Sequence, residues 1–200
     1  ASKRGVVVRV VLDEVNGVHV LKASESPVGI DFDTLKALQD AGITVINGGR
    51  SNGLMHNKII IVDGTTLFMG SWNMSYNDTF RNNNNLLQIT DPTLIANYQA
   101  KFNELFVNQK FGTRSVVGAL KPKLLLDGVA VENYFSPVDR VSNKLVSYVN
   151  GATKSVKFMI FTFTDKNLAA AMIAAAQKGI PVEGVIENRG ASEGVLPTLF

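Results

Sequence analysis

With 200 residues, 46% of them hydrophobic and 18% charged, the chain can bury a core, which excludes an intrinsically disordered segment. The absence of cysteine excludes a disulfide framework and thiol chemistry and fits a reducing or an oxidising compartment equally. The net charge of +3 comes from scattered side chains and indicates no particular partner, and no apolar run is long enough to span a membrane.

The first half of the chain predicts alternating strands and helices. A short helical end and a turn at Gly5 precede a buried strand, and Gly-rich residues 47–53 predict a loop. The expected elements, in chain order, are strand Val6–Leu12, helix Asp31–Ala41, strand Ile43–Ile46, strand Met55–Val62, strand Thr66–Met69, strand Asn85–Thr90 and helix Pro92–Phe106.

A second set of helices and strands follows a stretch in which the periodicity fades. We therefore expect residues 1–110 to form one part, residues 111–131 a linker, and residues 132–200 a second part. The elements expected in the second part are strand Glu132–Phe135, helix Asp139–Val149, strand Ser155–Phe163, helix Asp165–Lys178 and strand Ile180–Glu187.

One pattern occurs twice. Residues 175–187 (AAQKGIPVEGVIE) align with residues 1–13 (ASKRGVVVRVVLD), with Gly179 on Gly5 at an offset of 174. Either the chain contains two copies of one unit, or two unrelated units share a common connection in which glycine closes a helix before a strand.

Residues 55–73 (MHNKIIIVDGTTLFMGSWN) contain the candidate catalytic side chains. His56 and Lys58 lie two positions apart in a predicted strand, so both project from one face roughly 6–7 Å apart. Such a pair alone is typical of an exposed edge strand, and Asp63-Gly64 is an ordinary hairpin turn. Six fixed residues at fixed spacing, however, arise by chance roughly once in 10⁸ starting points.

We expect the turn to bring Ser71 and Asn73 toward His56. Neutral imidazole can attack phosphorus, an ammonium can neutralise a phosphate oxygen, and a hydroxyl and an amide can hold the remaining oxygens. The sequence has no evident cluster of metal ligands, so this chemistry would use no metal ion and no cofactor.

The pattern H-x-K-x₄-D-x₆-G-S-x-N resembles the HKD signature of the phospholipase D superfamily, whose members include phospholipases, phospholipid synthases and nucleases. The resemblance continues through residues 81–89 (RNNNNLLQI), the helix ending in KFNELF, and residues 132–139 (ENYFSPVD). It implies an α/β fold with a mixed sheet flanked by helices, in two pseudo-symmetric halves, each of them incomplete in this chain.

In that family two HKD motifs meet at one site, where one histidine becomes a phosphohistidine and the other protonates the leaving group. The resemblance assigns His56, Lys58 and, in support, Asp63 to catalysis. It assigns Ser71 and Asn73 to phosphate binding.

A second histidine is therefore needed. The chain has only two histidines, and His19 lies outside any such motif, so we expect it at the surface or on an edge strand. The repeat offset places the counterpart of His56 beyond Phe200. We accordingly expect the chain to be an interior fragment whose second HKD half comes from missing C-terminal sequence; a dimer mate is the alternative.

The chain departs from the family pattern at the acidic residue that can orient the histidine. Many relatives place an acidic residue after GSxN, whereas this chain has four asparagines, Asn82 to Asn85, which could equally reflect turn chemistry.

As function we expect hydrolysis of phospholipid head groups, with transphosphatidylation as a variant of the same chemistry. A nuclease of the same superfamily and an inactive scaffold are the alternatives. The substrate partner is thus a phospholipid or a nucleic acid, and a secreted or a cytoplasmic bacterial location would both fit.

Overall fold

The computed structural model describes residues 1–15, 17, 20–24, 31–48 and 53–188. Contacts within the chain divide it into two compact units, Ala1–Asp139 and Arg140–Phe200. No helix within the described ranges is both long and apolar enough to cross a membrane.

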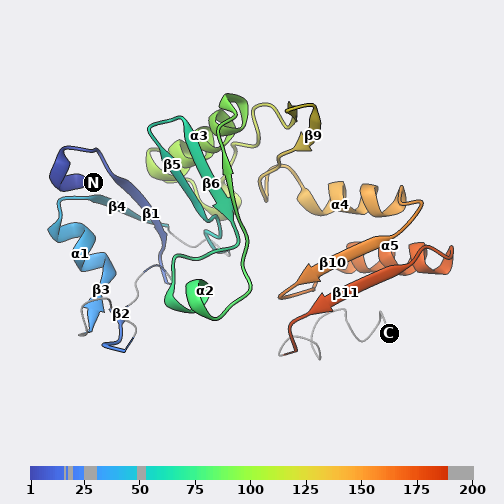
Figure 1. Ribbon diagram of the computed structural model, residues 1–200. Coiled ribbons are helices and arrows are strands. Elements are labelled where there is room, and N and C mark those ends of the chain that lie inside the picture. Colours follow the sequence, from blue (N-terminus) through green and yellow to red (C-terminus); the bar gives the residue numbers. More distant parts are fainter. Residues whose placement is uncertain (16, 18–19, 25–30, 49–52, 189–200) are drawn as a thin grey trace. The chain divides into compact units, whose positions relative to one another are not determined.

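The first unit contains short strands, helices and hairpins (Figure 1). Its elements are η1 (Ser2–Arg4), β1 (Arg9–Asp13), β2 (Val20–Leu21), β3 (Phe32–Asp33), α1 (Thr34–Asp40), β4 (Thr44–Gly48), β5 (Ile59–Val62), β6 (Thr66–Gly70), α2 (Tyr76–Phe80), β7 (Leu86–Ile89), α3 (Pro92–Phe106), η2 (Gly112–Arg114), β8 (Lys123–Leu126) and β9 (Val129–Glu132). Most predicted elements are present with shorter bounds, because ladder pairing ends before the apolar pattern does.

The strands of this unit form several small sheets. β1 pairs with β4 in parallel, whereas β5, β6 and β7 form an antiparallel sheet in that order. β2 pairs with β3, and β8 with β9, both antiparallel. The α/β class with parallel and antiparallel pairing is confirmed. The described strands nevertheless form separate sheets where the sequence predicts one mixed sheet.

Helix α3 covers one face of the β5–β6–β7 sheet (Figure 1). Asp91 caps its first turn by accepting a hydrogen bond from the Leu94 backbone N–H at 2.8 Å, and Pro92 occupies the first helical position, where no backbone donor is needed. The buried core cluster under the helix consists of Leu67, Leu94, Ile95, Tyr98 and Phe135. Burying this apolar face is what holds the hairpin that follows His56 and Lys58 in place.

The segment predicted as a linker is structured. Within residues 111–131, β8 and β9 form a hairpin whose turn contains Asp127 (φ 49°) and Gly128 (φ 82°), and this hairpin packs in the first unit. The fading periodicity therefore reflects a short amphipathic hairpin and its turn. The assignment of residues 1–110 and 132–200 to two repeats stays a prediction.

The second unit contains α4 (Val141–Asn150), β10 (Val156–Ile160), α5 (Lys166–Gln177) and β11 (Val182–Ile186). β10 and β11 pair in parallel, and α5 connects them, starting at the Asp165 cap. A small apolar cluster of Phe163, Ala169 and Met172 joins α5 to the inner face of the strands. This is a βαβ unit, the arrangement in which parallel strands are normally connected.

The two segments that align in sequence share a local conformation. Gly5 has φ 80° and Gly179 has φ 81°, and each precedes a strand that pairs in parallel with a neighbour. Both positions thus use the left-handed backbone region that glycine tolerates best. This similarity agrees with the predicted repeat but would also arise in two unrelated units that end a helix in the same way.

Candidate active site

His56 and Lys58 lie in a segment without regular secondary structure directly before β5, not within the strand itself. The ammonium Nζ of Lys58 donates a hydrogen bond to the backbone carbonyl of His56 at 2.7 Å. His56 is exposed, and Lys58 is half-buried. The sequence predicted a strand over residues 55–62, whereas the pairing with β6 begins only at Ile59.

The end of β1 fixes the position of this segment. Asp13, the last residue of β1, is only 7% exposed, and its Oδ2 accepts a hydrogen bond from the backbone N–H of Met55 at 3.1 Å. The two residues are 42 positions apart in the chain. A buried carboxylate therefore holds the residue that directly precedes His56, a contact for which the sequence offered no local signal.

The electrostatic surroundings favour a neutral imidazole at His56. Partial burial lowers the pKa of His56, the positive charge of Lys58 lowers it further, and the negative charge of Asp13 acts in the opposite direction. The pKa of Lys58 is also lowered by burial, while Asp78 opposes that change. Neutral imidazole is the form that can act as a nucleophile.

The GSxN residues follow the end of β6, where the chain approaches β7 closely. A Cβ atom at Gly70 would overlap the backbone carbonyl oxygen of Asn85, so only glycine fits there. The Ser71 backbone N–H donates to that same carbonyl at 3.1 Å. The Ser71 hydroxyl donates to Asn84 Oδ1 at 2.9 Å and accepts from the Asn85 N–H at 3.0 Å.

Asn73 is held by a carboxylate that the sequence analysis did not single out. Asp78, in α2, accepts hydrogen bonds through Oδ2 from the Asn73 backbone N–H at 2.7 Å and from the Asn73 side-chain Nδ2. Asp78 is 9% exposed, whereas Asn73 is exposed. The signal for it was weak: one acidic residue within a polar stretch that forms a helix of only five residues.

The asparagine run belongs to the same network. Asn82 Nδ2 donates to Asp78 Oδ1 at 2.6 Å, and Asn84 Nδ2 donates to the Asp78 backbone carbonyl at 3.2 Å. These amides therefore orient the GSxN loop. The side-chain hydrogen bonds described for the run lead to Ser71 and Asp78 and not to the imidazole of His56. His19, expected at the surface, lies outside the described residues.

Asp63 lies apart from the other predicted site residues. It occupies the turn between β5 and β6 with φ 51°, followed by Gly64 at φ 67°, the conformation typical of a tight hairpin turn. Asp63 lies five positions after Lys58 across strand β5, which corresponds to roughly 17 Å at about 3.3 Å per residue. Its position supports a role in the hairpin, and its predicted catalytic role stays a prediction.

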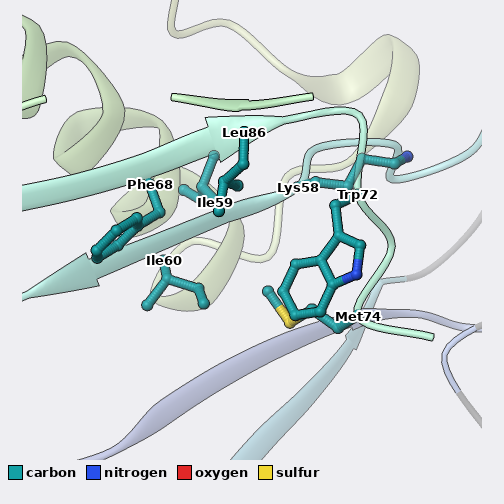
Figure 2. Close-up of a pocket in the computed structure, with 7 residues that line it drawn as sticks. All are labelled: Lys58, Ile59, Ile60, Phe68, Trp72, Met74 and Leu86. Carbon is teal, nitrogen blue, oxygen red and sulfur yellow. The ribbon is translucent and has the colours of Figure 1, made fainter. Parts of the chain in front are cut away.

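An apolar hollow lies beside Lys58. Figure 2 shows Trp72 and Met74, from the GSxN loop, close to Lys58 and to side chains of the β5–β6 face. The indole N–H of Trp72 donates to the Thr79 hydroxyl at 3.1 Å, which fixes the ring. The hollow is lined by Lys58, Ile59, Ile60, Phe68, Trp72, Met74 and Leu86.

Comparison with known proteins identifies the family. Residues 1–106 match the sequence family described as "Cardiolipin synthase, PLD-like domain", which is more than half of the chain. The chain belongs to this PLD-like domain family. The prediction of a phospholipase D relative, made from the HKD spacing, is thereby confirmed.

Several curated proteins align with about half of the chain. Mitochondrial cardiolipin hydrolase of Xenopus tropicalis is 35% identical over 103 residues, which are 52% of this chain and 43% of that protein. The same enzyme of Danio rerio is 35% identical over 104 residues, 52% of this chain and 41% of its own length. Phospholipase D of Rickettsia prowazekii (strain Madrid E) is 34% identical over 98 residues, 49% and 42% of the two chains. The chain thus spans less than half the length of the curated relatives it matches.

Proposed function

We propose that this chain contributes one half of the active site of a metal-independent phosphodiesterase that hydrolyses phospholipid head groups. The observation that supports this most directly is the hydrogen bond from the Lys58 ammonium to the backbone carbonyl of His56. The GSxN loop adds the Ser71 hydroxyl and the Asn73 amide, both of which are oriented by hydrogen bonds. The names of the relatives, cardiolipin hydrolase and phospholipase D, agree with that chemistry.

In the proposed first step the neutral imidazole of His56 attacks the phosphorus of the diester. A nitrogen–phosphorus bond forms while the bond from phosphorus to the leaving alcohol oxygen breaks. Lys58 neutralises charge on a non-bridging oxygen, and Ser71 and Asn73 line the site for the phosphate. The lowered pKa of His56 keeps its imidazole available as the nucleophile at neutral pH.

A second imidazole is needed to complete the reaction. One imidazole cannot be the covalent nucleophile and also give a proton to the leaving oxygen in the same step. The second imidazole, after giving up its proton, would take one from water, whose oxygen then attacks phosphorus and releases His56. We propose that it comes from a second HKD motif in the full-length protein; a second copy of the chain is the competing source.

The surface next to Lys58 favours a lipid over a nucleic acid. A phospholipid joins its phosphate to apolar chains through one glycerol unit, and Lys58 likewise lines an apolar hollow together with Trp72 and Met74. Met74 is 53% exposed, so this apolar surface is open to solvent. A nucleic-acid site would instead be expected to surround the phosphate with further basic side chains.

The test compares substrates and a single substitution. Full-length protein would be assayed with phospholipid vesicles, plasmid DNA and a generic phosphodiester, with and without EDTA, beside His56→Ala. We expect hydrolysis of the vesicles that EDTA leaves unchanged, and a loss of at least about 10³-fold in His56→Ala because the covalent path is removed. Activity abolished by EDTA would contradict the metal-independent mechanism, and wild-type rates in His56→Ala would contradict the role of His56.

A further inference from the structure

Asp78 is a buried carboxylate, and burying its charge destabilises the fold unless hydrogen bonds compensate for the lost water. It is 9% exposed, and it belongs to α2, a helix of only five residues that could not be stable by itself. The Ser75 hydroxyl accepts a hydrogen bond from the Asp78 backbone N–H at 3.2 Å, which starts the helix. The short helix thus carries a buried charge to a defined place beside the GSxN loop.

The carboxylate joins segments on both sides of α2. Its Oδ2 accepts from the backbone and the side chain of Asn73, before the helix, and its Oδ1 accepts from Asn82, after it. Its backbone carbonyl accepts from Asn84, which in turn accepts from the Ser71 hydroxyl. Both polar residues of GSxN are therefore oriented through Asp78.

The chemistry of the carboxylate determines how Asn73 is turned. An ionised carboxylate only accepts hydrogen bonds, so the nitrogen of the Asn73 amide, and not its oxygen, must face Asp78. One N–H is used there, and the second N–H is left as a donor. Without the carboxylate the exposed amide could rotate and present its oxygen, which would repel a phosphate.

Asp78 also acts on Lys58. The negative charge of Asp78 favours the ammonium form of Lys58 and opposes the effect of burial on its pKa. Burial works to raise the pKa of Asp78 itself, and hydrogen bonds from Asn82 and Asn73 outweigh burial, so that pKa lies below its ordinary value. The carboxylate is therefore ionised under the conditions in which Lys58 would bind phosphate.

We propose that Asp78 is the positioning residue of this half-site. Its carboxylate orients the Asn73 amide, and its negative charge favours the ammonium form of Lys58, so that the amide and the ammonium can both bind the phosphate of the substrate. This inference rests on the proposed function. Asp78 is an acidic group after GSxN, where the asparagine run has none, but the hydrogen bonds of its carboxylate go to Asn73 and Asn82 and not to the histidine.

The substitution that tests this is Asp78→Asn, which keeps the size and removes the charge. One amide N–H would then face a donor of Asn73 or Asn82, so the loop would shift. We expect kcat/KM for vesicle hydrolysis to fall roughly 10- to 100-fold, as small misplacements of catalytic groups do. Asp127→Asn, the same change at an exposed turn residue, is the matched control and should keep the wild-type rate.

The pH profile of the rate distinguishes an effect of the Asp78 charge from a purely structural role of this side chain. The charged side chain acting on Lys58 is Asp78, and the neighbouring His56, whose pKa burial and Lys58 lower, adds a positive charge only when it is protonated. Removing the negative charge disfavours the ammonium, so the part of the alkaline limb that reflects Lys58, at higher pH than the titration of the second imidazole, should move to lower pH in Asp78→Asn. Asp78→Glu retains the charge and should leave that limb in place, with a smaller loss of rate. An alkaline limb that moves equally in both variants, or in neither, overturns the proposal.

The outcomes distinguish this inference from the proposed function. If His56→Ala is inactive while a folded Asp78→Asn keeps the wild-type rate, only the role of Asp78 is wrong. If His56→Ala is fully active, the proposed function is wrong. If the circular dichroism of Asp78→Asn shows that it does not fold, Asn82→Ala is assayed in its place. It removes one exposed partner of the carboxylate and should lower kcat about 3- to 10-fold; a wild-type rate there overturns the proposal.

Discussion

At the scale of single residues, the reactivity expected of His56 depends on two charges of opposite sign. Beyond the lowering by partial burial, Lys58, two positions along the chain, lowers the pKa of the imidazole further, and Asp13, at the end of β1, raises it. Asp13 also holds the Met55 backbone N–H, so it affects both the position and the charge state of the segment. The two influences can be separated by substituting each residue in turn.

The first prediction concerns the pKa of His56. Asp13→Asn keeps an oxygen that can accept from Met55 but removes the charge that favours imidazolium, so the pKa of His56 should fall. Lys58→Met removes the charge that disfavours imidazolium, so the pKa should rise. NMR titration of the imidazole, assigned with His56→Gln, measures both shifts. Shifts of the same sign in the two variants would contradict this account.

At the scale of elements, the sequence predicted best where local signals and packing coincide. Helix α3 has the predicted bounds, Pro92–Phe106, because the Asp91 cap, the proline and a 3.6-residue apolar period all agree. The β8–β9 hairpin was missed because its four-residue strands are half exposed and its Asp127-Gly128 turn resembled a linker. The HKD spacing singled out Ser71 and Asn73 as candidates, and their role in the site stays a prediction. Asp13 and Asp78 were not singled out because their contacts with the motif residues are not encoded in the linear pattern.

A buried polar cluster connects α3 to the segment that follows it. Glu104 is 1% exposed and accepts hydrogen bonds from Lys101 Nζ at 2.7 Å and from the Ser115 hydroxyl at 2.8 Å. It also accepts from the backbone N–H groups of Val116 and Val117, at 2.5 and 2.9 Å. The segment leading to β8 is thus fastened to the helix by one carboxylate. Burial raises the pKa of Glu104, and these hydrogen bonds, led by that from Lys101, lower it by more.

The second prediction concerns the stability contributed by this cluster. Glu104→Gln places an N–H against donors and should lower the free energy of unfolding at pH 7 by about 1–3 kcal/mol. Because the pKa of Glu104 is depressed in the folded state, the wild-type advantage is present above the ordinary value of 4.5 and is lost as the pH falls through the folded pKa. Urea unfolding at pH 7 and under acidic conditions measures this.

The control for that experiment is an exposed ion pair. Glu183→Gln breaks the contact of Glu183 with Lys157, whose side chains are 65% and 72% exposed, and should change stability by less than about 1 kcal/mol. An equally small effect in Glu104→Gln would show that the buried cluster does not fasten the segment to α3.

At the scale of the whole molecule, the central question is where the second imidazole comes from. The first unit holds His56, and the second unit presents a βαβ arrangement whose outer strand face exposes apolar side chains, with Met159 84% and Val185 67% exposed. Parallel strands are normally covered on both faces. This agrees with the proposal that the second unit is completed by further structure in the full-length protein, and the alternative is that two copies of the chain meet.

The last prediction separates these two sources by mixing active and inactive chains. Full-length wild-type protein and His56→Ala would be combined in equal amounts under conditions that permit subunit exchange. If each chain contains its own pair of histidines, the variant only dilutes the enzyme, and the activity per total chain is about one half of the wild-type value. If two His56 residues from different copies must meet, only pairs of wild-type chains are active, and the activity falls to about one quarter. Because our proposal places both imidazoles in one full-length chain, we expect one half, together with a specific activity that dilution does not change. A result near one quarter, with activity lost on dilution, would establish that the complete site forms between two copies.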